Sequence, residues 1–110
     1  MTGGVHRGPA RHERPVIDEA ALVAARAADR ALVEARERGA TRWAAFLEPL
    51  PDALRDGAVW ELRRIAQRAR AAYGPKDSIR DVLPATVSEP LLEAIDRLLK
   101  ELARREAAGG

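Results

Sequence analysis

Apolar residues recur along most of this chain at the three- and four-residue spacing of an amphipathic helix. In residues 18–38 the stripe is built mainly from alanine and steps alternately by four and three: Ala21, Ala25, Ala28, Leu32 and Ala35. Residues 57–73 and 89–107 show the same periodicity, and the last segment carries a broad leucine face. We therefore expect long helices at about 18–38, 57–73 and 89–107, with the last at the centre of the core.

Capping residues and prolines divide this pattern into elements. Five polar residues stand where helix N-caps are expected: Asp18, Thr41, Asp56, Ser78 and Ser88. Gly39 stands where a left-handed residue ends the first long helix. We expect short helices at about 41–48 and 78–83, and a proline-interrupted connector with no more than one turn between residues 50 and 57.

The composition favours an all-α fold. Alanine contributes 23 residues and leucine 12, against four aromatic residues, so strand-forming side chains are scarce. The 110 residues fit one domain. We expect a small helical bundle over residues 16–107, preceded by a disordered basic arm at 1–15 and followed by a frayed tail at 108–110.

Trp60 falls on the polar side of its expected helix, opposite the apolar stripe. It shares that side with arginines and one glutamine, which give the candidate partner-binding set: Trp60, Arg63, Arg64, Gln67, Arg68 and Arg70. A side chain of this size is seldom left exposed without cover. Either residues 47–54 fold back over Trp60, or this face binds a partner or a second copy of the chain, since Trp and Arg are enriched at interface hot spots.

A second apolar pattern lies in the short helix at 41–48. Its i, i+3, i+4, i+7 residues are Trp43, Phe46, Leu47 and Leu50. The pattern suits an anchor helix that enters a partner's groove, and it equally suits a helix that closes its own bundle. The second interpretation is favoured, because a chain with four aromatic residues needs them in its core.

The positive charge is concentrated in two segments. Residues 57–75 hold four arginines against Glu61, a net +3, and residues 1–15 hold three arginines against Glu13, a net +2. These are suitable materials for phosphate contacts, so nucleic-acid binding through Arg63, Arg64, Arg68, Arg70 and the arm is the alternative function. The Trp60 helix lacks the Asn, Ser and Thr side chains often used to read base edges.

The residues that support catalysis are few. The chain has no cysteine, two serines at expected caps and two histidines, His6 and His12, in the expected disordered arm. Catalysis and metal binding both require positioned groups, so we expect no enzyme, no catalytic residue, no metal site, no cofactor and no small-molecule substrate.

Two further features concern origin and compartment. Arginine outnumbers lysine 17 to 2, which is typical of a GC-rich genome and suggests a bacterial source. The absence of cysteine fits a reducing compartment, and no apolar run is long enough for a membrane span. We expect a soluble, cytoplasmic, non-enzymatic protein–protein interaction module, an adaptor or a small subunit of an assembly.

Overall fold

The computed structural model describes residues 10–109, and the side chains of 107–109 lie outside this description. The described residues contain helices and no strand, which confirms the all-α prediction. The α-helices are α1 (Pro15–Glu37), α2 (Thr41–Leu47), α3 (Leu50–Asp56), α4 (Val59–Ala71) and α5 (Ala85–Gly109). Short 3-10 turns cover Arg11–Glu13 and Ile79–Asp81.

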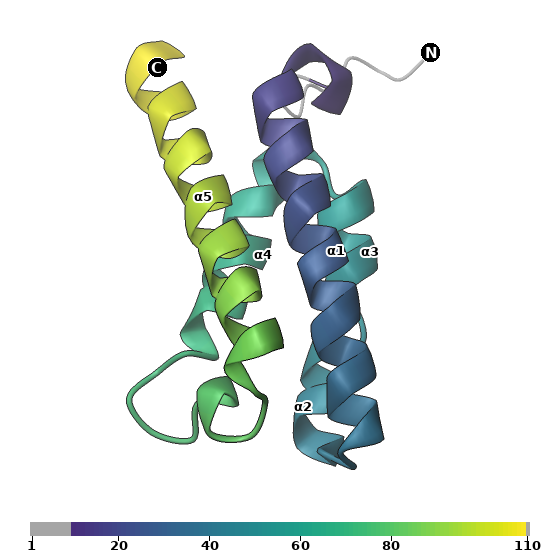
Figure 1. Cartoon of the computed structure of the whole chain (residues 1–110). Helices are drawn as coiled ribbons and strands as arrows, with labels where there is room; N and C mark the ends of the chain where they lie inside the picture. The colour runs from purple at the N-terminus through teal and green to yellow at the C-terminus, as the bar shows by residue number, and fades with distance from the viewer. Residues whose placement is uncertain (1–9, 110) are drawn as a thin grey trace.

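The chain runs up and down through a small bundle (Figure 1). α1 descends, α2 and α3 ascend as two consecutive pieces, α4 descends behind α5, and α5 ascends beside α1. Gly39 makes the first reversal with φ of 66°, and the amide of Ala40 donates to the Ala35 carbonyl across it. The predicted left-handed end of the first helix is thus confirmed.

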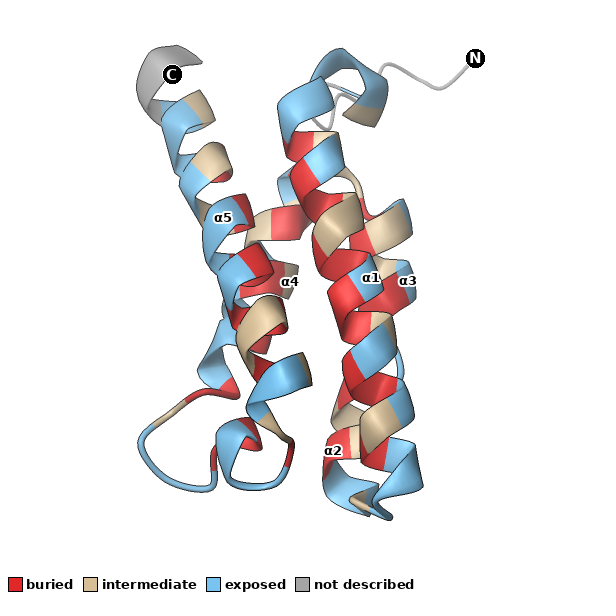
Figure 2. Ribbon diagram, in the orientation of Figure 1, coloured by how far each residue is buried: buried red, intermediate tan, exposed pale blue. Residues whose placement is uncertain are grey.

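α1 lies at the centre of the core, and the prediction that the last helix occupies that place is wrong. α1 packs against α2, α3 and α5, whereas α5 packs mainly against α1 and α4. The expected alanine stripe is buried, and a second row beside it is buried too: Ala20, Ala24, Ala27 and Ala31. Because alanine is small, helices can approach α1 closely on two sides (Figure 2).

Residues 10–15, the end of the predicted N-terminal arm, are folded onto the helical bundle. Arg11 donates from Nη1 to the carbonyls of Leu54 and Gly57, at 2.8 Å each, and from Nε to Asp18 at 2.7 Å. Asp18 therefore accepts from Arg11 instead of capping α1, which begins at Pro15. The prediction of disorder is wrong for residues 10–15, and residues 1–9 lie outside the described residues.

The expected connector at 50–57 is a helix of its own. α3 begins with Leu50 and Pro51 in its first turn, where proline needs no hydrogen-bond partner. Leu50 and Leu54 are buried, and α3 packs on α1. Pro49 at the N-cap and Pro51 in the first turn therefore start this helix rather than prevent it.

The segment between α4 and α5 is held by polar contacts. Ser78 Oγ accepts from the amide of Arg80, and Asp81 accepts from the amide of Ser78, each at 3.1 Å, which confirms this capping pair. The helix that it caps is only Ile79–Asp81, shorter than the expected 78–83. Ile79 and Leu83 are buried and fix this segment to the core.

The start of α5 differs from the prediction. The helix begins at Ala85, where the Pro84 carbonyl accepts from the amides of Val87 and Ser88. Ser88 is buried inside the helix and is not its cap. α5 also continues to Gly109, past the expected end at 107, and Gly110 lies outside the described residues. None of the helices in the described part is long and apolar enough to cross a membrane.

Candidate interaction surface

The outward side of α4 carries the candidate partner-binding residues. Val59, Leu62, Ala66 and Ala69 are buried, and Trp60 on the opposite side is 47% exposed. Among the described aromatic residues Trp60 is the most exposed, since Trp43 and Tyr73 are each 7% exposed and Phe46 is half-buried. The predicted orientation of this helix is confirmed.

The position of α4 is fixed at a tight corner. Glu61 accepts from the amide of Ala58 at 2.9 Å and so caps the first turn, the role expected of Asp56. A Cβ on Gly57 would lie 2.4 Å from the Ala53 carbonyl oxygen and 3.0 Å from Ile65 Cδ1. Glycine is needed here because a Cβ would meet the last turn of α3 itself, whose Ala53 carbonyl also accepts from the Gly57 amide at 2.8 Å.

Two of the four arginines on α4 are engaged by α5. Arg63 pairs with Glu106, and Arg70 Nε lies 2.9 Å from the Asp96 carboxylate. All four side chains are about half exposed, so each pair contributes at most about 1 kcal/mol to stability. The pairs reduce the positive charge along the α5 side of α4.

Arg64, Gln67 and Arg68 complete the outward side. All three are exposed, and neither arginine forms a salt bridge with any residue that the structure describes. Arg64 and Arg68 are one turn apart, and Trp60 lies one turn before Arg64. The structure therefore brings Trp60, Arg64 and Arg68 together in one row and sets Arg63 and Arg70 to its side.

The segment Leu47 to Leu54 does not hide Trp60. Pro49, Leu50 and Ala53 lie against Ile65 and Ala69, on another flank of α4. With this segment in place Trp60 still exposes nearly half of its surface.

The candidates of the second apolar pattern belong mostly to the core. Trp43, Leu47 and Leu50 are buried, at 7%, 0% and 7% exposure, in agreement with the favoured interpretation. Phe46 differs because it is half-buried at the edge of α2, with its ring edge-to-face on Trp43 at a centroid distance of 5.7 Å. Of the four, Phe46 alone remains available to a partner.

Two adjoining hollows lie between α4 and the segment formed by α2 and α3, and Phe46 and Arg68 line both. The first has a volume of about 130 Å³ and is mainly apolar, and the second has about 390 Å³ and is lined by Arg42, Lys76 and Asp77 as well. We call the two together the α2–α4 groove. Arg42 lies far before Arg68 in sequence and Lys76 lies in the loop after α4, so the periodicity of α4 pointed to neither residue.

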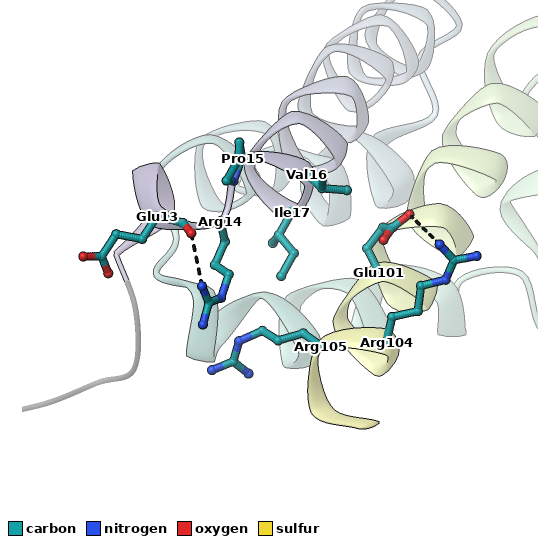
Figure 3. A pocket seen from close by; sticks show the side chains of 8 residues that line it. All are labelled: Glu13, Arg14, Pro15, Val16, Ile17, Glu101, Arg104 and Arg105. Atoms are coloured by element: carbon teal, nitrogen blue, oxygen red, sulfur yellow. Dashed lines mark hydrogen bonds and ion pairs between the residues drawn. The ribbon is translucent and has the colours of Figure 1, made fainter. Parts of the chain in front are cut away.

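Another hollow of about 390 Å³ lies between the start of α1 and the end of α5 (Figure 3). Its cations are partly engaged, because Arg14 donates to the Glu13 carbonyl at 3.2 Å and Arg104 lies 3.9 Å from Glu101. Arg105 Nε is buried without a hydrogen-bond partner among the described residues. Pro15, Val16 and Ile17 form much of the remaining wall. The hollow lies at the end of the bundle where α4 begins, since nearby Arg11 donates to the Gly57 carbonyl and Glu106 pairs with Arg63.

The pKa shifts in the described residues belong to side chains with structural roles. Burial raises the pKa of the Tyr73 hydroxyl well above its usual range, and this hydroxyl donates to the Ser88 carbonyl at 2.6 Å. A hydrogen bond from Arg80 lowers the pKa of Glu89, and the same guanidinium lies 5.5 Å from the Tyr73 ring centre. This cluster ties the α4–α5 segment to α5.

The described residues hold no group of three or more His, Asp or Glu side chains suited to a metal ion. His12 is exposed in the turn before α1, and His6 lies outside the described residues. Comparison of the chain with protein-family models, with curated proteins and with solved structures finds no match.

Proposed function

We propose that this chain is a non-enzymatic protein–protein interaction module, an adaptor or small subunit of a bacterial cytoplasmic assembly. Its contact surface is the row of Trp60, Arg64 and Arg68, with Gln67 beside it and Arg63 and Arg70 on its flank. The observation that carries the proposal is the 47% exposure of Trp60 beside two arginines that no described acid neutralises.

The chemistry of this row suits a protein partner. A large ring supplies apolar area, and guanidinium groups supply directed hydrogen bonds to carboxylates, which is the combination typical of interface hot spots. A hot-spot residue contributes about 2 kcal/mol or more to binding, which corresponds to roughly a 30-fold change in Kd. The row lies on a helix whose other side packs on the core, so the backbone that carries the contact residues needs little ordering on binding.

The test substitutes the two tryptophans separately. Trp60→Ala should lower thermal stability by only about 1 to 2 kcal/mol, because half of the ring is exposed. Trp43→Ala is the matched control, and it should cost about 3 to 5 kcal/mol, because Trp43 is buried. Unfolding is followed by the helical circular dichroism signal.

Association is measured by nuclease-treated pull-downs from the source cells and by sedimentation of the purified chain. The proposal predicts proteins, or a self-associated species, that the unaltered chain retains and Trp60→Ala loses. The proposal is refuted if the unaltered chain and Trp60→Ala retain the same proteins while Trp60→Ala is as unstable as Trp43→Ala. Trp60 would then be an ordinary core residue.

The second candidate is nucleic-acid binding through the arginines of α4. Arg64 and Arg68 favour it, since they are exposed one turn apart, whereas the pairing of Arg63 and Arg70 with α5 disfavours it. Binding should then fall steeply with salt and disappear when Arg64 and Arg68 are both replaced by Glu. A chain that shifts neither DNA nor RNA at low ionic strength excludes this candidate.

A further inference from the structure

The first hollow of the α2–α4 groove can receive one apolar side chain. Arg68 lines it, and its apolar walls are Phe46, Pro49, Leu50, Ala53, Ile65 and Ala69. Phe46 and Ile65 are only half-buried, so apolar surface is exposed here after folding is complete. A cavity of about 150 Å³ holds benzene, so the 130 Å³ of this hollow suits the ring of Phe or the branched end of Leu.

The second hollow gathers positive charge. Arg42, Arg68 and Lys76 line it, and Asp77 is the one acid among its lining residues. All three cations are exposed, and none forms a salt bridge with a described residue. On the opposite edge of α4, by contrast, Glu106 and Asp96 of α5 engage Arg63 and Arg70. The groove therefore presents cations for which the described part of the chain supplies no paired acid.

We propose that the α2–α4 groove binds an acidic, amphipathic segment of a partner protein. One large apolar side chain of that segment fills the hollow between Phe46 and Ile65, and neighbouring carboxylates lie against Arg42, Arg68 and Lys76. The inference rests on the proposed function in that the occupant is a protein, and Arg68 belongs both to the groove and to the Trp60 row.

The apolar half of the groove favours a peptide over a nucleic acid. Four of its six apolar lining residues are aliphatic, and Phe46 supplies the single aromatic ring. Single-stranded nucleic acids are typically held by several aromatic rings on which successive bases stack. An aliphatic hollow beside a cationic one matches a side chain followed by carboxylates, and the cations would raise the association rate of an acidic segment.

The experiment is a selection of random displayed peptides on the full chain, followed by affinity measurements on the enriched sequences. Enriched peptides should combine at least two acidic residues with one Leu, Ile or Phe. The double variant Arg42→Glu/Lys76→Glu should weaken their binding by about tenfold or more, because two attractions become repulsions. The matched control is Arg26→Glu/Lys100→Glu, which makes the same charge change at two exposed positions outside the groove and should leave affinity within about twofold.

Circular dichroism melts of both double variants establish that they fold. The inference is overturned if the enriched peptides are neutral or basic, if no peptide is enriched over an unrelated helical protein, or if acidic peptides bind both double variants equally. It is also overturned if oligonucleotides bind instead and lose affinity in Arg42→Glu/Lys76→Glu, because the groove is then a phosphate site.

The two proposals fail in different ways. A cellular partner lost with Trp60→Ala but retained with Arg42→Glu/Lys76→Glu leaves the proposed function standing and refutes the groove. Acidic peptides that bind the groove without any Trp60-dependent partner support the groove and refute the Trp60 row as the contact surface.

Discussion

Replacing Gly57 with alanine should destabilise the fold more than any other glycine-to-alanine change in its described part. The added methyl would lie 2.4 Å from the Ala53 carbonyl oxygen and 3.0 Å from Ile65 Cδ1. The first neighbour is backbone of α3 and cannot rotate away as a flexible side chain can. Relief of the clash therefore requires the last turn of α3 and the backbone at Gly57 to shift, and this movement also disturbs the corner with α4.

The magnitude follows from what this movement disturbs. Overpacking of a well-packed site costs about 1 to 3 kcal/mol, and Leu54 and Leu62 on either side of the corner are fully buried. The hydrogen bonds from the Arg11 guanidinium to the Leu54 and Gly57 carbonyls would be distorted as well. We expect a loss of about 2 to 3 kcal/mol, which for a chain of this size lowers Tm by roughly 10 °C or more.

Gly74→Ala is the matched control. A Cβ at Gly74 meets only the Ala71 carbonyl oxygen at 3.6 Å, an ordinary contact, and its φ is not in the left-handed region. This change should be neutral or stabilise by about 0.4 to 1 kcal/mol, because alanine restricts the unfolded chain. Thermal and urea unfolding by circular dichroism compare the two variants, and equal Tm values would refute the packing described for the α3–α4 corner.

Two further variants examine polar contacts that the fold makes at long range. Arg11→Met keeps the apolar stem of the side chain but removes its donors to Leu54, Gly57 and Asp18, so it should lower stability by about 1 to 3 kcal/mol in urea unfolding. An unchanged midpoint would mean that Arg11 does not hold the α3–α4 corner. Tyr73→Phe should cost about 1 kcal/mol through the lost hydrogen bond to the Ser88 carbonyl. The raised pKa of Tyr73 adds a pH dependence: its contribution is complete below the usual tyrosine pKa of about 10 and is lost as the pH rises beyond it. Since the chain has one tyrosine, phenolate absorbance should appear only together with loss of the helical signal, and phenolate formed near pH 10 in a folded chain would contradict this.

The helices and their buried faces could be predicted because their signals are local. Periodicity alone placed Trp60 opposite the buried side of α4, where the structure has it at 47% exposure. Gly39 likewise marks the end of α1 by its own conformational freedom, with φ of 66°. Each of these features depends on residues within a few turns of one another.

The features that could not be predicted depend on contacts between distant segments. α3 is seven residues long and would be marginal alone, and it is stabilised by packing on α1. Arg11 is ordered because carbonyls at the end of α3 accept its hydrogen bonds, more than forty residues later in the chain. Ser88 was expected to cap the last helix, but α5 begins at Ala85 and holds Pro90 in its second turn, although a proline there removes one helical hydrogen bond and crowds a preceding carbonyl.

The charge of the candidate site shows the same limit most clearly. A count over residues 57–75 gives a net +3 and places the positive surface along all of α4. The fold redistributes that charge, because acids of α5 engage Arg63 and Arg70, while α2 and the loop after α4 bring Arg42 and Lys76 beside Arg68. The strongest cationic concentration is thus displaced from the middle of the helix to its edge against α2. An acidic partner should therefore contact α2 as well as α4, and charge reversals at Arg42 should weaken its binding more than reversals at Arg63, whose charge Glu106 already offsets.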